Sequence, residues 1–329
     1  MSCLPVFFHL SVLLPRLRGL VGLLTALLLL LPLTASAAQA EDSATLRKIR
    51  DTGVIVLGFR PESPPFAYLD AGLKPVGYSM ELCHRVVDAV KAHLSLPDLE
   101  VKLVVVNSAT RLPMVANGSV DLECGITTNT LERQKTQAFS ITTFVAESRL
   151  LSKRSTAVRS LDQLRGEPVA STMATTSIQY LHHANQTRLL DMKILVAQDD
   201  KEAFRMLQSG RALAYAMDDV LLRTLRAGSS QPADFVISEE AFSVEPYALG
   251  LPLGDAVFKQ LVDSVLSGLY QRGEIEAIYE RWFQSPFPPK GINLKLPMSA
   301  AFKRVVQKPT DSAIRSVIGI DPAGWCLRA

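Results

Sequence analysis

The feature that most constrains the fold is an alternation of short apolar runs with helical segments, which the chain repeats in two halves. In the first half, the apolar runs lie at 53–59, 101–106 and 120–124. Short runs of aliphatic and β-branched residues bounded by turn residues predict buried strands. Because helical segments separate these runs, the sequence predicts a mostly parallel α/β sheet.

Two helices are predicted between these strands. Apolar residues recur at every fourth position across 82–94, which is one face of a helix, and Ser79 is expected to cap its first turn. A shorter helix is predicted at 111–117, closed by Gly118. The proline-rich stretch at 61–70 is expected to form a loop.

The same pattern restarts after Ser148. Strands are predicted at 149–154, 168–171, 193–197 and 212–217, again with helices between them. The chain is therefore expected to fold into two α/β lobes of roughly 100 residues each.

The end signals are clearest for the helix between the last two of these strands. It starts with Asp199 as its cap and Glu202 three residues later, and it stops at Gly210. A further strand is predicted at 247–253 and helical structure at 255–283. The proline-punctuated tail that follows is expected to run over the surface.

Residues 1–40 have the composition of a secretory signal peptide. Arg16 and Arg18 precede an apolar run at 20–33, and the small residues "TASAAQA" follow. Cleavage after 35–37 or after 38–40 fits the small-residue pattern. A membrane anchor is the alternative, but the apolar run is shorter than the about 20 residues that a span needs. We expect export, with cleavage of this segment.

Charge and cysteine content exclude several classes of function. The chain has 35 basic and 32 acidic residues, and loss of 1–40 with its two arginines lowers the net charge from +3 to +1. No basic surface for nucleic acid is indicated. Cys83, Cys124 and Cys326 remain; their odd number leaves at least one thiol unpaired in an oxidising compartment. We expect Cys124 to be a small buried residue, no metal or cofactor, and a monomer.

Polar residues gather where the predicted strands end. Because the carboxyl ends of parallel strands meet at one edge of a sheet, where α/β proteins bind ligands, these residues are expected to face a crevice between the lobes. They are Arg60, Ser108, Arg111, Thr127, Thr128, Arg133, Thr175, Thr176 and Asp218.

The order and spacing of several segments resemble a known family. The segments include "GVIVLGFR", "PPFAY", "RLPMVANGSVDLECG", "TTNTLERQK" and "SGRALAYAMDD". Together they resemble the solute-binding proteins of amino-acid ABC importers, and most of all the members that bind glutamate and aspartate. The resemblance extends from about residue 46 to about residue 311.

The resemblance implies a two-lobed periplasmic-binding-protein fold of the second type. Lobe 1 would comprise 41–145 and 243–290, lobe 2 would comprise 146–242, and 291–329 would be a tail. Two strands crossing between the lobes, near 145–148 and 243–247, would form a hinge. The implied mechanism is hinge closure around a ligand, after which a membrane permease recognises the closed form.

The resemblance also implies roles at the backbone end of an amino-acid ligand. Arg133 would grip the α-carboxylate through two parallel donors, with Thr127 and Thr128 beside it. The alternative for Arg133 is a surface arginine that pairs with Glu132 or another acid on its helix. The alternative for this segment is capping of the helix start, for which Asn129 or Thr130 is available, and capping can coexist with ligation. The segment "CGITTNTLERQK" lacks the glycine spacing and the Lys-Ser/Thr pair of a phosphate loop.

Lobe 2 would supply the remaining contacts to the backbone end of the ligand. Thr175 and Thr176 would approach the α-carboxylate from the opposite wall, after Met173-Ala174 in place of the family's Ser-Gly. Asp218 would bind the α-ammonium group, because a buried carboxylate needs a partner. The alternative for Asp218 is a helix cap.

Arg60, Ser108 and Arg111 match positions that bind the ligand's side chain in the family. Two departures bear on that ligand. Ile126 replaces a serine, and Asp200 stands where the family has a histidine. An aspartate would repel a side-chain carboxylate unless it is protonated or paired with one of the two arginines. Glutamate or aspartate is therefore the expected ligand, and glutamine, asparagine or another polar amino acid is the alternative.

Two other classes of function compete with a transport receptor that performs no chemistry. One is a periplasmic dehydratase on the same fold, for which Asp200 is the available general acid or base. The other is a sensor or peptidoglycan-enzyme domain, which would carry a long C-terminal extension in place of the short tail after Pro286.

Overall fold

The computed structural model describes residues 43–313. The predicted signal peptide and Cys326 lie outside this range. Among residues 43–313, no helix has both the length and the apolar character needed to cross a membrane.

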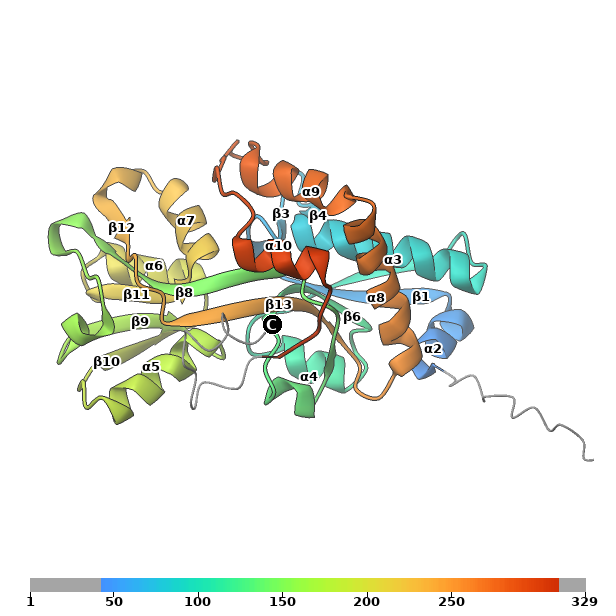
Figure 1. The fold of residues 1–329 in the computed structure, drawn as a ribbon, viewed down its shortest axis with the longest axis horizontal. Coiled ribbons are helices and arrows are strands. Elements are labelled where there is room, and N and C mark those ends of the chain that lie inside the picture. Colours follow the sequence, from blue (N-terminus) through green and yellow to red (C-terminus); the bar gives the residue numbers. More distant parts are fainter. Residues whose placement is uncertain (1–42, 314–329) are drawn as a thin grey trace, which may run out of the picture. The chain divides into compact units, whose positions relative to one another are not determined.

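A ten-stranded sheet runs through both lobes (Figure 1). Its main path is β10-β9-β11-β8-β13-β6-β1-β5, with β12 paired to β8 and β7 paired to β13. In chain order the strands are β1 Val54–Phe59, β5 Glu100–Val105, β6 Leu122–Thr128, β7 Ala138–Phe139, β8 Phe144–Lys153, β9 Pro168–Thr172, β10 Lys193–Ala197, β11 Ala214–Asp218, β12 Phe235–Ile237 and β13 Ser243–Leu251. The predicted two-lobed α/β fold is confirmed, with the addition that the lobes share one sheet.

The two longest strands, β8 and β13, join the lobes. They pair antiparallel, from Ser243 opposite Ser148 to Tyr247 opposite Phe144. Strand β8 continues into lobe 2, where it pairs with β11, and β13 continues into lobe 1, where it pairs with β6. The stretches predicted as the hinge coincide with this pair. Their movement as a hinge stays a prediction.

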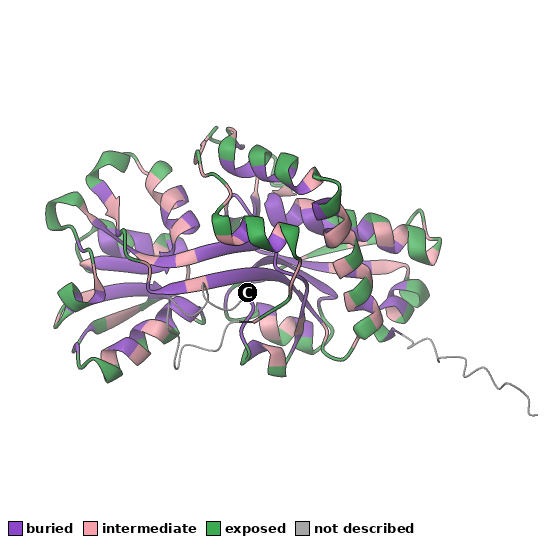
Figure 2. Cartoon of the chain, in the orientation of Figure 1, coloured by how far each residue is buried: buried purple, intermediate pink, exposed green. Residues whose placement is uncertain are grey.

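Helices cover both faces of the sheet, with their inner sides buried and their outer sides exposed (Figure 2). In lobe 1, α3 and α8 lie on the opposite face of the sheet from α4 (Figure 1). The lobe 1 helices are α2 Ala44–Thr52, α3 Tyr78–Leu94, α4 Arg111–Ala116, α8 Ala256–Gln271 and α9 Glu274–Tyr279, with a π-helical turn at Glu280–Gln284. Helix α10 Ala300–Gln307 follows in the tail. The lobe 2 helices are α5 Thr176–Thr187, α6 Asp200–Gln208 and α7 Asp219–Ala227. Short 3₁₀ turns lie at Arg133–Lys135, Arg154–Thr156, Leu161–Leu164 and Pro232–Asp234.

Four local predictions need correction. Helix α3 begins after Gly77, and Ser79 does not cap it, since its hydroxyl donates to the carbonyl oxygen of Gly125 (2.7 Å). The stretch expected to be a loop contains β2 Glu62–Ser63 and β3 Ala67–Leu69, which form a small antiparallel sheet with β4 Pro75–Val76. Strand β5 is largely exposed because it is the edge of the main sheet. The tail contains α10, which packs against α8 and β8.

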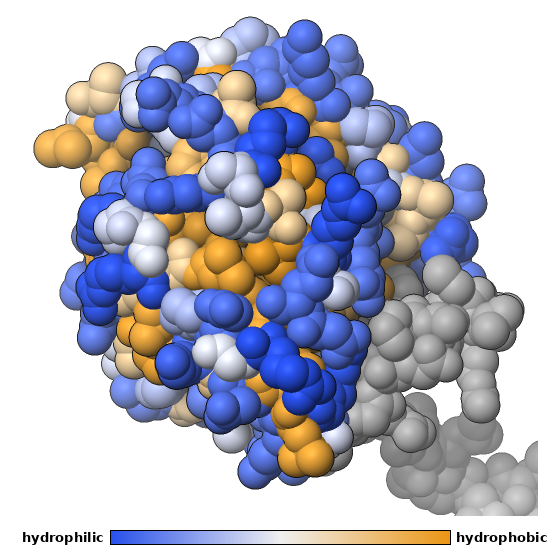
Figure 3. Space-filling view, turned by 90° about the vertical axis from the view of Figure 1, so that its left-hand side faces the viewer, coloured by the Kyte–Doolittle hydropathy of each residue, from blue (hydrophilic) through white to orange (hydrophobic). Residues whose placement is uncertain are grey.

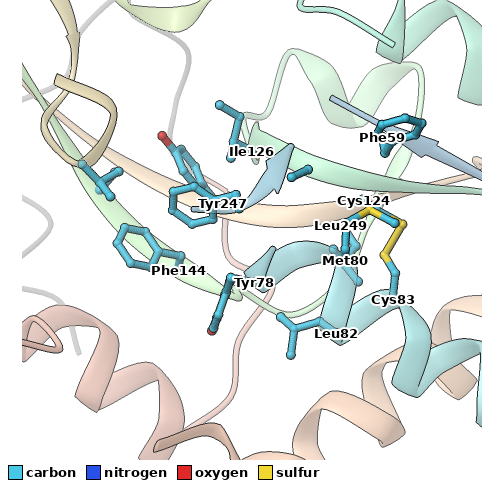
Figure 4. Close-up of a cluster of buried hydrophobic side chains, with 14 of the residues drawn as sticks. Phe59, Tyr78, Met80, Leu82, Cys83, Cys124, Ile126, Phe144, Tyr247 and Leu249 are labelled. Carbon is cyan, nitrogen blue, oxygen red and sulfur yellow. A yellow bond between two sulfur atoms is a disulfide. The ribbon is translucent and has the colours of Figure 1, made fainter. Parts of the chain in front are cut away.

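Cys83 and Cys124 form a disulfide, with their Cα atoms 6.1 Å apart. Cys124 is buried as expected, but it is not an unpaired apolar residue. Cys83 belongs to the buried face of α3, and Cys124 belongs to the face of β6 that meets this helix. The bond therefore lies inside the core of lobe 1, among Met80, Leu82 and Leu249 (Figure 4).

The far end of lobe 2 shows hydrophobic residues framed by hydrophilic ones (Figure 3). Leu189, after α5, and Val196, on the edge strand β10, are exposed apolar residues of this lobe. Scattered exposed apolar side chains are common on folded proteins and do not by themselves indicate a partner.

Candidate functional site

All the predicted site residues are buried, and they come from segments that converge where the lobes meet. Arg60 follows β1, Arg111 begins α4, and Arg133 follows β6. From lobe 2, Thr175 and Thr176 begin α5, Asp200 begins α6 and Asp218 ends β11. The contacts among them divide into a group around Arg60, a group around Arg133 and a group around Asp218.

Arg60 is held by both lobes. Its Nε donates to Ser63 Oγ and its Nη1 to Ser108 Oγ, both at 2.7 Å. Its Nη2 lies 3.6 Å from Asp200 Oδ2 of lobe 2. Asp200 and Arg60 therefore form an ion pair across the lobes. An aspartate at this position was expected to repel a side-chain carboxylate unless it is protonated or paired with an arginine, and Asp200 is paired.

Asp200 also has two neutral partners in lobe 2. Its Oδ1 accepts hydrogen bonds from Thr172 Oγ1 (2.6 Å) and from the Tyr215 hydroxyl (3.1 Å). Asp199, next to it, caps α6 as predicted by accepting from the backbone N–H of Glu202 (2.7 Å). The adjacent acids thus have separate duties, one at the helix start and one towards Arg60.

Arg111 is a buried cation with few partners. Its Nη1 lies 3.5 Å from the carbonyl oxygen of Ile126, and its Nε has no hydrogen-bond partner within residues 43–313. Burial lowers the pKa of Arg111 to about 9, and the charge of Arg133 adds to that effect. A buried cation whose donors are largely unused is suited to an anionic group.

Arg133 lies between the lobes and not on the surface. Its Nη1 donates to the carbonyl oxygen of Thr128 (2.8 Å), and its Nη2 donates to that of Ala174 in lobe 2 (3.4 Å). Burial lowers the pKa of Arg133, and Glu245 is the largest charge acting in the opposite direction. The alternative of a surface pair with Glu132 is wrong, because Glu132 pairs with Lys135.

The threonines at the start of α5 use their hydroxyls within the protein. Thr175 caps the helix by accepting from the N–H of Ile178 (3.3 Å), and it donates to the carbonyl oxygen of Thr172 (2.7 Å). Thr176 donates to Glu245 Oε2 (2.7 Å). What this segment can offer an anion is therefore the backbone N–H groups of a helix start.

Asp218 does not cap the helix that follows it. It occupies the N-cap position of α7 but makes no capping bond, so that alternative is wrong. Its Oδ1 accepts from Ser148 Oγ (2.7 Å), and its Oδ2 accepts from the Tyr247 hydroxyl. The pKa of Asp218 is raised to about 7, mainly by burial and also by the neighbouring carboxylate of Glu245.

Two buried acids were missed by the sequence analysis. Glu245, on β13, is fully buried and accepts hydrogen bonds from Thr176 and Ser243. Glu123, on β6, is buried beside Arg111. A signal was present, since each acid lies among apolar residues in its strand, and a charge in a buried strand requires partners.

Ile126 points away from the polar cluster. It belongs to the hydrophobic core of lobe 1, on the same face of β6 as Cys124 and near Tyr247 (Figure 4). Alternate residues of a strand face opposite sides, so Glu123 and Thr127 share the other face. Among residues 43–313, no group of three or more His, Cys, Asp or Glu residues could hold a metal ion.

Comparison with known proteins gives concordant matches. Residues 55–285 match the family model of bacterial extracellular solute-binding proteins, family 3. The chain is 45% identical to the L-glutamate/L-aspartate-binding protein of Pseudomonas aeruginosa over 283 residues, which cover 85% of this chain and 93% of that protein. It is 42% identical to the glutamate/aspartate import solute-binding protein of Salmonella typhimurium over 296 residues, which cover 88% and 98%.

A similar solved structure is that of the solute receptor for L-cysteine of Neisseria gonorrhoeae. Its TM-score is 0.64 at 26% identity, and the match covers 73% of this chain and 93% of that chain. The type II periplasmic-binding-protein fold implied by the resemblance is confirmed. The family match over most of the chain and the identity to the two curated relatives agree with that fold, and the protein belongs to the bacterial extracellular solute-binding proteins, family 3.

Proposed function

We propose that the protein is a periplasmic receptor that binds glutamate or aspartate between its lobes and delivers it to the permease of an ABC importer. The observation that carries this proposal is the set of three buried arginines at the lobe interface. Arg60, Arg111 and Arg133 all come from lobe 1, and lobe 2 faces them with the start of α5 and with Asp218. The names of the two curated relatives support the same ligand class.

The site has opposite charges for the two ends of an amino-acid backbone. Arg133 and the start of α5 would bind the α-carboxylate from the two lobes, with Thr127 and Thr128 beside the arginine. Asp218 would bind the α-ammonium group. A cation close to Asp218 would also offset the cost of placing this carboxylate next to Glu245 in the interior.

The remaining cations define the ligand side-chain subsite, by which we mean Arg60, Ser108, Arg111 and Asp200. Arg60 is already paired with Asp200 and hydrogen-bonded to Ser63 and Ser108. Arg111 has donors to spare and would bind the side-chain carboxylate. The Asp200–Arg60 pair is also the observation that favours the second candidate, a receptor for glutamine or asparagine, because it neutralises one of the two cations.

We further propose that the protein catalyses no reaction. Asp200, the acid considered for a dehydratase, is held by Thr172, Tyr215 and Arg60. A general acid or base must present an oxygen to the substrate. Incubation of the purified protein with glutamate or aspartate, followed by NMR, should show the amino acid unchanged.

A thermal-shift screen of the twenty amino acids tests the proposal. The chain should be produced without residues 1–40, unfolded and refolded to remove bound ligand, and mixed with each amino acid. Glutamate and aspartate should raise the melting temperature, with micromolar affinity, or about −8 kcal/mol. A response to glutamine or asparagine alone would select the second candidate. No response to any amino acid would contradict the receptor function.

A further inference from the structure

Glu123 occupies a space that two glycines leave open. It is buried on β6, on the strand face that it shares with Gly125 and Thr127. A Cβ atom at Gly125 would lie 2.0 Å from Glu123 Oε1, and one at Gly250 of β13 would lie 3.1 Å from Glu123 Cβ. Glycine at these two positions therefore leaves room for the Glu123 side chain, and a larger residue at either position would crowd it.

Three arginines act on the charge of Glu123. They come from three elements: Arg111 from α4, Arg60 from the end of β1 and Arg133 from the turn after β6. The same Cβ position at Gly125 lies 3.6 Å from Cδ of Arg60. The carboxyl group is thus part of the environment of the ligand side-chain subsite.

The neutral groups around Glu123 are polar. Thr127, two residues along β6, lies beside Glu123 and favours its ionised form, although the two form no hydrogen bond of regular geometry. The Gln137 amide lies near Glu123, since the Cβ position at Gly250 is 3.2 Å from Gln137 Nε2 and 3.4 Å from Glu123 Oε2. Within the described part of the chain, both Glu123 oxygens, both polar atoms of Gln137 and Arg111 Nε have no hydrogen-bond partner.

The formal charge of the ligand side-chain subsite, taken together with Glu123, depends on whether Glu123 is protonated. Arg60 and Arg111 bring two positive charges, and Asp200 brings one negative charge. With Glu123 ionised the sum is zero, and with Glu123 protonated one positive charge remains. A dicarboxylic ligand adds one negative charge on its side chain, whereas its amide adds none.

Burial and a bound dicarboxylic ligand both favour the protonated form of Glu123. Burial raises the pKa of Glu123, and the charge of Arg111 is the largest effect that opposes the rise. A ligand carboxylate on Arg111 would offset that opposing charge and stabilise the protonated form of Glu123. An amide ligand has no charge on its side chain and would leave the protonation of Glu123 unchanged.

We propose that Glu123 sets the charge of the ligand side-chain subsite by taking up a proton when a dicarboxylic amino acid binds, and so favours glutamate and aspartate over their amides. The proton comes from the solvent and binds a carboxyl oxygen of Glu123. The ligand's side-chain carboxylate stays ionised against Arg111. This inference rests on the proposed function.

Proton uptake by Glu123 determines the direction in which ligand affinity changes with pH. Uptake of a proton on binding means that affinity falls as pH rises, by up to about ten-fold per pH unit where one full proton is taken up. Asp218 would release protons when the ligand's ammonium group binds. That contribution is common to wild type and to a variant at position 123, so their difference isolates Glu123.

Calorimetric titration with glutamate, in buffers of equal pH and different ionisation enthalpy, measures the protons exchanged. Wild type should take up more protons per glutamate than Glu123→Gln, by up to about one, and its affinity should fall more steeply with pH. Glu132→Gln is the matched control, since it removes an exposed acid paired with Lys135, and it should behave as wild type. Equal proton exchange in wild type and Glu123→Gln would overturn the inference.

A second measurement uses wild type alone and does not depend on the folding of a variant. Infrared difference spectra with and without ¹³C-labelled glutamate should show a new band of a protonated carboxyl group that does not shift with the label. Absence of this band would also overturn the inference. If glutamate and aspartate do not bind at all, the proposed function fails; if they bind without this band, only the role of Glu123 fails.

Discussion

Arg133 of lobe 1 donates a hydrogen bond through Nη2 to the carbonyl oxygen of Ala174 in lobe 2, over 3.4 Å. Two ion pairs also connect the lobes, Arg60 with Asp200 at 3.6 Å and Lys201 with Glu62 at 2.6 Å. The guanidinium group of Arg133 therefore lies where the lobes meet and touches the loop that leads into α5. A carboxylate between Arg133 and that helix start would be bound by both lobes at once.

Charge and geometry at Arg133 are expected to contribute separately to binding. Arg133→Glu should abolish amino-acid binding, because it replaces the cation by an anion. Arg133→Lys keeps the charge but loses the planar pair of donors, and we expect it to weaken binding about 10- to 100-fold. Calorimetric titration measures the dissociation constants of both variants, with Arg154→Lys as the control. Wild-type affinity in Arg133→Glu would show that the site lies elsewhere.

Ala174 adopts a left-handed conformation, with φ of 55°. This conformation costs a residue with a Cβ atom about 1 kcal/mol, and glycine avoids that cost. Ala174→Gly should therefore raise the free energy of unfolding by up to about 1 kcal/mol, measured by urea denaturation. Ala89→Gly, inside α3, should lower it by about 1 kcal/mol. A destabilised Ala174→Gly protein would contradict this account of the loop.

The disulfide should contribute strongly to stability. Cys83 and Cys124 are 41 residues apart, and for a loop of this length the chain-entropy model gives about 4 kcal/mol. Unfolding in urea should therefore occur at a lower concentration when wild type is reduced. In the double variant Cys83→Ala/Cys124→Ala, reductant should have no effect. Equal midpoints for oxidised and reduced wild type would be inconsistent with this bond.

Asp218 should make the ligand-free protein less stable at alkaline pH. Its pKa rises on folding from 3.8 to about 7, so the folded state favours the neutral acid. The associated stability is present below pH 3.8 and is lost as pH rises through about 7. Asp218→Asn lacks this titration, and at pH 8 it should be more stable than wild type by up to about 4 kcal/mol.

The pH dependence distinguishes this effect from a change in packing. Urea unfolding of ligand-free wild type and Asp218→Asn should give a stability difference that grows from pH 4 to pH 8. Asp162→Asn, which alters an exposed acid paired with Arg188, should show no such trend. A difference that stays constant with pH would argue against the buried acid as the cause.

Asp200 should lower the preference for acidic ligands. Asp200→Asn removes the charge paired with Arg60, so glutamate should bind about ten-fold more tightly while glutamine changes little. The ratio of the two dissociation constants, measured by calorimetry, gives the result. Asp234→Asn, on the exposed surface of lobe 2, is the control. An unchanged ratio would place the ligand side chain away from Asp200.

Local patterns predicted several elements correctly, although the expected cap at Ser79 was wrong. The capping of α6 by Asp199 and the end of α4 at Gly118 follow from neighbouring residues, and both are present. The prediction that β5 is buried was wrong, because an apolar run does not tell whether a strand is central or at the edge of a sheet. The helix α10 was missed because the surrounding prolines favoured an irregular tail.

The candidate site also has features that the sequence shows and contacts that only the structure shows. Polar residues at strand ends could be identified in the sequence, since the position of a strand end is a local property. The alternatives for Arg133 and Asp218 could be decided only when their surroundings were visible: Glu132 pairs with Lys135, and Asp218 contacts Ser148 and Tyr247. Glu123 and Glu245 were missed because an acid in a buried strand indicates that partners are needed but does not show which groups those partners are.

The sequence by itself determined the order of the elements, the two-lobed plan and the positions of the arginines, because periodicity and turn residues act over a few neighbours. Only the tertiary structure decided which distant groups meet: Cys83 with Cys124, Asp200 with Arg60, and Glu123 with Arg111. The physical reason is that the free energy of a buried charge or thiol depends on groups brought close by folding. Those groups lie 12 to 140 residues away along the chain.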